Sequence, residues 1–143
     1  MIEDISTSLR NKNILVAGGT GLVGVNLTKK LIKVDANVLS SFFSNKPSAF
    51  ESNYKRFDFT KFEDCIEATK DMDYVFFCAG QTFGAKVMKE NPTAFILPNL
   101  KIYAGLLEAC RLNNVERAIL ISSSTLYQEA NYPISENQLD LNK

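Results

Sequence analysis

The stretch Ile14–Leu27, which reads ILVAGGTGLVGVNL, decides the fold of this chain. Its first part, Ile14–Ala17, is a short apolar run with two β-branched residues, which predicts a buried strand. Apolar residues then recur at helical spacing, which predicts a helix over Gly21–Lys33. A glycine-rich turn joins the two, so the stretch predicts a strand, a tight turn and a helix in direct succession.

The turn carries Gly18, Gly21 and Gly24 in the spacing GxxGxxG, a close variant of the GxGxxG dinucleotide fingerprint. Gly18 allows a sharp turn off the strand, Gly21 lets a pyrophosphate approach the backbone, and Gly24 lets the helix pack closely. Free N–H groups at the helix start attract phosphate. The alternative is a tight turn that binds nothing. The residues predicted to hold the pyrophosphate are Gly18, Thr20, Gly21, Leu22, Val23 and Gly24.

Composition excludes several classes of function. The 143 residues predict one domain, and 16 basic residues balance 16 acidic ones, which gives no electrostatic case for nucleic acid or an anionic membrane. No apolar run approaches the ~20 residues of a membrane helix. The polar start MIEDISTSLRNK is unlike a signal peptide, so we expect a cytoplasmic protein. There is no histidine, and Cys65, Cys78 and Cys110 lack CxxC spacing, which predicts reduced thiols and no metal site.

Predicted strands and helices alternate along the rest of the chain. This alternation predicts an α/β fold, a doubly wound parallel sheet (Rossmann fold) with three αβα layers. One helix is expected over Thr60–Thr69, with Thr60 and Glu63 as a capping box. A long helix is expected over Asn91–Leu112, capped by Asn91-Pro92 and kinked at Pro98. The further strands are expected at Asn37–Phe43, Lys55–Phe57, Asp73–Cys78 and Ala118–Ser122.

The end of the second strand normally selects the cofactor, because an acid about 20 residues past the glycines binds the NAD ribose. That position is Ser44, and no acid occurs between Ala36 and Phe50. The stretch holds serines and Lys46 instead, which favours NADP, with Ser44 and Lys46 meeting its 2′-phosphate. NAD remains the alternative, since Lys46 could be a solvated loop residue and the serines could serve either cofactor.

Three further strand ends carry candidate residues. Asp58, with Phe59 beside it, could accept a hydrogen bond from adenine, or could instead end the strand or cap the next helix. Ala79 and Gly80 follow Cys78 in a segment suited to close backbone approach, and Cys78 is interpreted as a small apolar residue rather than a nucleophile. Ser122–Tyr127 reads SSSTLY, and its hydroxyls could bind a substrate oxygen or satisfy a turn.

Together these segments resemble the extended short-chain dehydrogenase/reductase family, in its nucleotide-sugar epimerase/dehydratase branch. The motifs are GGTGLVG at Gly18–Gly24, DFT at Asp58–Thr60, DYVFFCAG at Asp73–Gly80 and SSSTLY at Ser122–Tyr127. Within the branch, Thr82–Cys110 is most similar to the GDP-L-fucose synthases, which are NADP-dependent epimerase-reductases. The resemblance implies hydride transfer at a carbon of a nucleotide sugar, and a homodimer built by the long helices.

The resemblance also implies site residues and a missing part. It implies that Ser123 is the catalytic hydroxyl, that Ala79 meets the cofactor ribose, and that Asn99 lies near the active centre. The family's Tyr-x-x-x-Lys pair is absent, since no tyrosine here has a lysine four residues later. We therefore expect residues 1–143 to be the NAD(P)-binding Rossmann domain of a longer enzyme with a C-terminal substrate domain, inactive alone. The alternative is a non-catalytic dinucleotide-binding or interaction module.

Overall fold

The computed structural model describes residues 5–47, 53–82, 84–91, 93–122 and 127–140. Its centre is a five-stranded parallel sheet in the order β3-β2-β1-β4-β5. In this order β1 lies in the middle. The chain adds β2 and β3 on one side of β1 and then crosses to add β4 and β5 on the other side, which confirms the predicted Rossmann-like α/β fold. The strands are β1 (Asn13–Ala17), β2 (Asn37–Phe42), β3 (Tyr54–Arg56), β4 (Tyr74–Phe77) and β5 (Arg117–Leu120).

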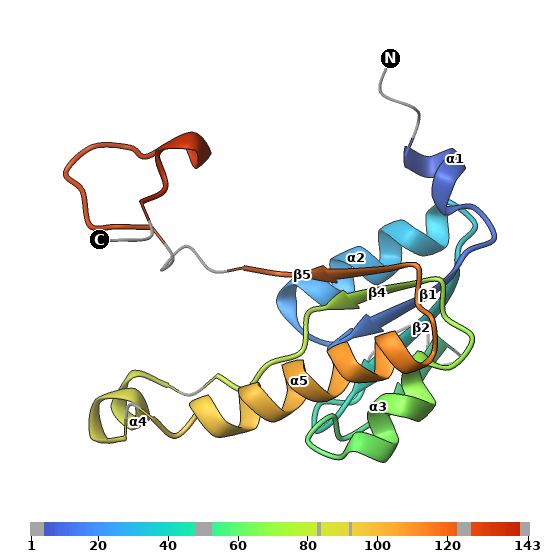
Figure 1. Cartoon of the computed structure of the whole chain (residues 1–143), viewed down its shortest axis with the longest axis horizontal. Coiled ribbons are helices and arrows are strands. Elements are labelled where there is room, and N and C mark those ends of the chain that lie inside the picture. Colours follow the sequence, from blue (N-terminus) through green and yellow to red (C-terminus); the bar gives the residue numbers. More distant parts are fainter. Residues whose placement is uncertain (1–4, 48–52, 83, 92, 123–126, 141–143) are drawn as a thin grey trace.

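Helices lie on both faces of this sheet (Figure 1). The helix α2 (Leu22–Lys33) covers one face, while α3 (Phe62–Thr69) and α5 (Ile96–Leu112) cover the other. The short helices α1 (Ile5–Leu9) and α4 (Ala85–Glu90) and a 3₁₀ turn, η3 (Glu136–Gln138), lie outside this three-layer body. Within the described residues, no helix is both long enough and apolar enough to span a membrane.

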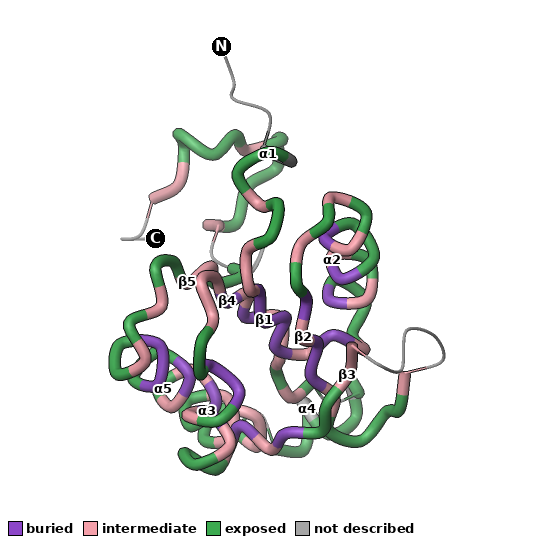
Figure 2. The backbone as a smooth tube through the Cα atoms, turned by 90° about the vertical axis from the view of Figure 1, so that its right-hand side faces the viewer, coloured by how far each residue is buried: buried purple, intermediate pink, exposed green. Residues whose placement is uncertain are grey.

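The core is divided by β1 into two halves, which Figure 2 shows as buried segments on either side of the sheet. Ile14 and Val16 pack toward α2, where they contact Leu31. Leu15 and Ala17 pack toward α3 and α5, in the cluster that contains Leu106. Both faces of β1 are therefore buried, which is why Ile14–Ala17 is apolar at every position rather than at alternate ones.

The long helix predicted over Asn91–Leu112 ends where expected but begins later, because α5 covers Ile96–Leu112. Asn91 is not its N-cap, since it is the C-cap of the preceding helix α4, which ends at Glu90. Pro98 is the third residue of α5, where a backbone N–H has no acceptor within the helix, so its missing N–H costs no helical bond. The expected kink therefore has no cause. Pro92 lies outside the described residues.

The capping box predicted from Thr60 and Glu63 is also wrong. The N-cap of α3 is Lys61, whose side chain makes no capping hydrogen bond. The Thr60 hydroxyl instead donates a 2.6 Å hydrogen bond to Asp58, so it is turned away from the helix start. The local hydrogen bonds of the preceding turn therefore outcompete the cap that the sequence pattern favours.

Several strand boundaries differ from the predicted ones. The second strand ends at Phe42 rather than Phe43, and the third covers Tyr54–Arg56 rather than Lys55–Phe57. The fifth ends at Leu120, so Ser122 follows it as exposed, irregular backbone.

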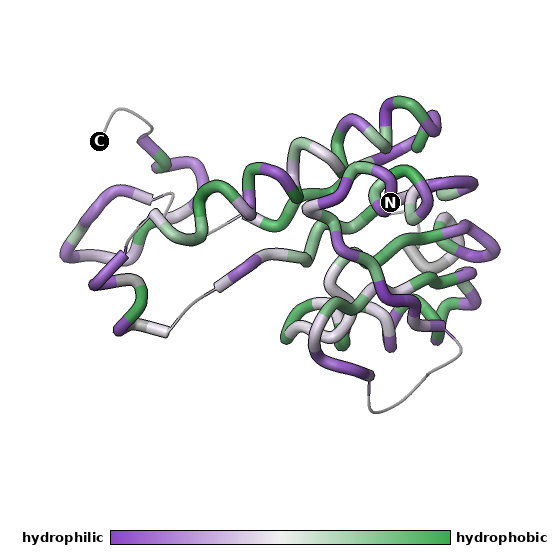
Figure 3. Tube along the Cα trace, turned by 90° about the horizontal axis from the view of Figure 1, so that it is seen from below, coloured by the Kyte–Doolittle hydropathy of each residue, from purple (hydrophilic) through white to green (hydrophobic). Residues whose placement is uncertain are grey.

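Hydrophobic residues also run along much of α5 (Figure 3), and Leu97 and Leu100 near its start are exposed.

Candidate functional site

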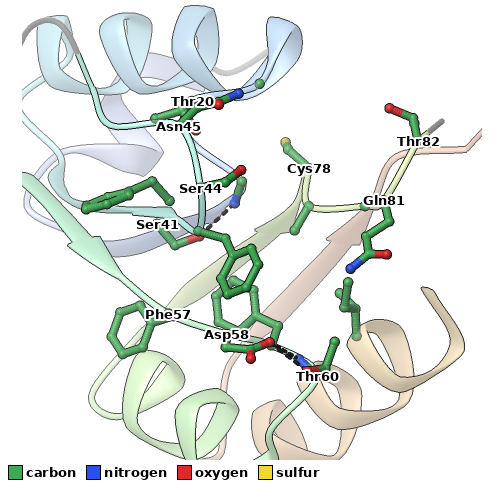
Figure 4. A pocket seen from close by; sticks show the side chains of 18 residues that line it. Thr20, Ser41, Ser44, Asn45, Phe57, Asp58, Thr60, Cys78, Gln81 and Thr82 are labelled. Atoms are coloured by element: carbon green, nitrogen blue, oxygen red, sulfur yellow. Dashed lines mark hydrogen bonds between the residues drawn. The ribbon is translucent and has the colours of Figure 1, made fainter. Parts of the chain in front are cut away.

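The carboxyl ends of the strands surround a cavity of about 540 Å³ (Figure 4). Its wall combines the glycine turn after β1, the ends of β2 and β4, the turn after β3 and one residue of α5. It is lined by Gly18, Thr20, Gly21, Ser41, Phe42, Phe43, Ser44, Asn45, Phe57, Asp58, Phe59, Thr60, Cys78, Ala79, Gly80, Gln81, Thr82 and Ile102.

Two of the three motif glycines are required by the fold itself. Gly18 has φ +83°, and a Cβ there would lie 2.6 Å from the backbone nitrogen of Ala79. A Cβ on Gly24 would overlap the carbonyl oxygen of Gly18. The turn after β1 therefore packs directly against α2 on one side and the end of β4 on the other, with no room for a side chain at either glycine.

Gly21 differs from both, because a Cβ there would approach only the Gly18 carbonyl oxygen, at 3.3 Å. Gly21 lines the cavity and is the N-cap of α2, with no side-chain hydrogen bond to cap the helix. The first turn of α2 also contains no acidic residue, unlike that of α3. The helix start therefore presents uncapped N–H groups and the positive end of its dipole without a neighbouring carboxylate.

The glycine turn is held in place by the two strands beside it. Gly18 donates its N–H to the Ser41 hydroxyl at 2.7 Å, and Gly19 donates to the Ser41 carbonyl at 2.8 Å. The Tyr54 hydroxyl donates to the Gly19 carbonyl at 3.2 Å. Ser41 and Tyr54 are thus positioning residues that sequence reasoning missed, and the only signal was a hydroxyl on a strand beside a glycine turn.

The serines of β2 are more engaged than the sequence suggested. Ser40 is fully buried and shares a 2.6 Å hydrogen bond with Thr28 of α2. Ser41 is almost fully buried and holds Gly18. The exposed hydroxyl left at the end of this strand belongs to Ser44, which lines the cavity, while Lys46 is exposed and lies outside the lining.

Asp58 takes part in the turn that follows β3 while also lining the cavity (Figure 4). Its Oδ1 accepts both the N–H of Thr60, at 3.1 Å, and the Thr60 hydroxyl. The hydrogen bond from the Thr60 hydroxyl lowers the pKa of the Asp58 carboxyl, so this group stays ionised at neutral pH. Phe59 is mainly a core residue, since it is buried and its ring stacks on Phe57.

Asn99 does not line the cavity. Its side-chain Oδ1 accepts the N–H of Gln81 at 2.7 Å, and its Nδ2 donates to the Gln81 carbonyl at 3.0 Å. The amide therefore fixes the backbone that follows β4, the segment that contains Ala79 and Gly80. Cys78 in the same segment is half-buried, and burial raises the pKa of its thiol, so it remains protonated at neutral pH.

The predicted site residues fall into three groups. The first group is brought together around the cavity and comprises Gly18, Thr20, Gly21, Ser44, Asp58, Phe59, Ala79 and Gly80. The second group lies outside the lining and comprises Leu22, Val23, Gly24, Lys46 and Asn99. Of these, Leu22 is 86% exposed. Ser123 lies outside the described residues.

The chemistry of this wall suits binding more than bond cleavage. Backbone amides, hydroxyls and one carboxylate surround the cavity, and the cysteine among them has a raised pKa. In the part of the chain that the structure describes, no three His, Cys, Asp or Glu side chains gather to hold a metal ion. The uncapped helix start beside Gly21 fits a diphosphate, and Asp58 offers a hydrogen-bond acceptor at the opposite end of the wall.

Comparison with known proteins adds a family. Residues 14–142 match the model of the NAD dependent epimerase/dehydratase family. An uncharacterized protein of Methanocaldococcus jannaschii is 28% identical over 83% of this chain and 42% of its own length. A GDP-mannose 3,5-epimerase of Oryza sativa subsp. indica is 24% identical over 81% of this chain and 32% of its own length.

Solved structures share the fold as well. An epimerase from Methanothermobacter thermautotrophicus is 29% identical, with a TM-score of 0.80, over 99% of this chain and 44% of that one. The chain thus spans less than half the length of each of these three relatives.

Proposed function

Because the chain belongs to the NAD-dependent epimerase/dehydratase family, we propose that it binds NADP through the cavity at the strand ends, with NAD as the alternative. The observation that carries this proposal is Gly21. It is the motif glycine that the fold leaves room to substitute, and it lies where the cavity meets the uncapped start of α2. A glycine there keeps the helix N–H groups accessible to a pyrophosphate.

The proposal extends to the protein of which this chain would be a part. That protein would be a nucleotide-sugar epimerase/reductase, similar to the GDP-L-fucose synthases, in which the cofactor supplies hydride transfer at a sugar carbon. The rice relative is named as a GDP-mannose 3,5-epimerase, which supports a nucleotide sugar as substrate class without favouring a fucose synthase. Ser123 would supply the catalytic hydroxyl, and the exposed leucines of α5 would support a homodimer.

The experiment is a titration of the chain with NADPH, followed by calorimetry and by the fluorescence of the reduced nicotinamide. Gly21→Val should abolish binding because its side chain fills the approach to the helix start. Gly84→Val is the matched control, since a Cβ on Gly84 meets nothing within 4 Å and Gly84 is not among the lining residues. Absence of binding at millimolar NADPH and NADH, or equal binding by Gly21→Val, would refute the proposal.

The second candidate is a non-catalytic dinucleotide-binding module. Residues 1–143 contain no tyrosine followed four residues later by lysine, and this favours the module only if the reading frame stops at Lys143. The gene decides between the two: a reading frame that continues beyond Lys143 into a Tyr-x-x-x-Lys segment supports the enzyme, and a stop codon there supports the module.

A further inference from the structure

Arg56 is a cation that the sequence patterns do not single out, and it lies just outside the cavity lining, in contact with the lining residue Phe43. It is the last residue of β3 and pairs in register with Phe42, the last residue of β2, so it lies at the carboxyl edge of the sheet. Its Nε donates to the carbonyl of Phe43 at 3.1 Å, and its guanidinium carbon lies 5.1 Å from the centre of the Phe43 ring. Phe43 itself lines the cavity.

These two contacts hold the guanidinium while leaving most of its donors unused. The Nε hydrogen bond and the position over the ring restrain the guanidinium, and the described residues offer no carboxylate within ion-pair distance of it. The two terminal nitrogens therefore remain as a forked pair of donors, the geometry that binds a phosphate through two hydrogen bonds. The field of Arg56 also reaches the cavity wall, where it contributes to the lowered pKa of Asp58.

Lys46, which follows the lining residues Ser44 and Asn45, is another cation near the cavity, but its side chain is less well fixed. It is exposed, and no hydrogen bond or ion pair fixes its side chain among the residues that the structure describes. A flexible ammonium contributes only a point charge, whereas a restrained guanidinium contributes a charge and hydrogen-bond donors of fixed orientation. Arg56 therefore matches a fixed phosphate better than Lys46 does.

We infer that Arg56, held over the Phe43 ring, is the residue that distinguishes NADP from NAD by binding the phosphate on the adenosine ribose. This inference rests on the proposed dinucleotide site and deepens it by naming the residue that sets cofactor choice. Ser44, two residues after the end of β2, lines the cavity, and its hydroxyl is a further donor for a phosphate at this edge of the sheet.

The test measures the dissociation constants of NADP⁺, NAD⁺ and 2′,5′-ADP for the full chain and its variants, by calorimetry at two salt concentrations. Arg56→Gln removes the charge from an exposed side chain, so the fold should survive, which circular dichroism checks. Arg10→Gln is the matched control. It removes the same charge from an exposed side chain that pairs with Asp35 and precedes the amino end of β1, at the edge of the sheet opposite the cavity.

Arg56→Gln should weaken NADP⁺ and 2′,5′-ADP by about 10- to 100-fold, the range for losing one charge-assisted pair, and NAD⁺ by less than about twofold. The salt dependence of NADP⁺ binding should fall with it, because one charge contact is lost. Arg56→Lys should bind NADP⁺ with intermediate affinity. Arg10→Gln should resemble the original chain.

Three results would overturn the inference while leaving the dinucleotide site intact. The first is that Arg56→Gln weakens NADP⁺ and NAD⁺ binding equally, which would mean that Arg56 only positions the loop at Phe43. The second is that it weakens neither, and the third is that the original chain binds both cofactors with equal affinity. An original chain that binds none of the three ligands would overturn the proposed function as well.

Discussion

The hydrogen bond between Thr28 and Ser40 joins α2 to β2 directly behind the glycine turn, and we predict that it couples the two elements energetically. Both side chains are fully buried, and their hydroxyl oxygens lie 2.6 Å apart. Thr28→Val keeps the shape of the side chain but leaves the Ser40 hydroxyl without its partner in the core. A buried polar group left unsatisfied costs about 1–3 kcal/mol, so the free energy of unfolding should fall by that amount.

The reverse substitution should cost less. Ser40→Ala removes the partner from a helical threonine, and a threonine within a helix can turn its hydroxyl to the carbonyl four residues earlier. We therefore expect a loss of about 0.5–1.5 kcal/mol, the net value of one hydrogen bond. The double variant Thr28→Val/Ser40→Ala leaves no hydroxyl to satisfy, so it should cost less than the sum of the two, with a coupling of about 1 kcal/mol.

Urea denaturation of the original chain, the two single variants and the double variant gives the coupling energy as a double-mutant cycle, provided that the slope of unfolding free energy against urea is unchanged. Thr93→Val is the control, because Thr93 is exposed and, among the described residues, its hydroxyl donates to the exposed Asn91. This variant should change stability by less than about 0.5 kcal/mol. The reasoning is refuted if the two single losses add up to the double loss within about 0.3 kcal/mol, or if Ser40→Ala costs more than Thr28→Val.

Two further predictions concern stability. Gly24→Ala should lower the unfolding free energy by about 1–3 kcal/mol, because its Cβ overlaps the Gly18 carbonyl, whereas Gly84→Ala should leave the urea midpoint unchanged. Burial raises the pKa of the Cys65 and Cys110 thiols to about 11, above the value of about 8.5 in an unfolded chain. The unfolded state therefore ionises first, so this stability is full below pH 8.5 and is lost toward pH 11. The urea midpoint should fall over that interval, and less steeply in Cys110→Ala; equal slopes would contradict the prediction.

The fold could be predicted because its signals are local and repeated. An apolar run followed by glycines and a helical pattern at Ile14–Leu27 already defines one strand–helix unit, and alternation along the chain repeats it. Element boundaries depend on competition that a linear pattern does not contain. Thr60 could cap α3 by its spacing to Glu63, but its hydroxyl bonds to Asp58 instead, and this choice is made by the turn geometry.

The gathering of the candidate site residues followed from the same rule, since parallel strands bring their carboxyl ends to one edge. What the sequence could not give are the side chains that hold backbone groups across the fold. Asn99 bonds to both polar groups of Gln81, and Ser41 holds the turn at Gly18. A reading of motifs assigns such an asparagine or serine to ligand binding, because the order of residues does not show which backbone groups need a hydrogen-bond partner.

The glycine motif shows how folding and binding can be separated at one site. The sequence offers Gly18, Gly21 and Gly24 on equal terms, but the structure excludes a Cβ at the first and third by contact with backbone atoms. Loss of cofactor binding after substitution at either of these two would therefore report on folding as much as on recognition. Only Gly21 has room for a side chain and also faces the cavity, so binding measured on its variants tests the dinucleotide site itself.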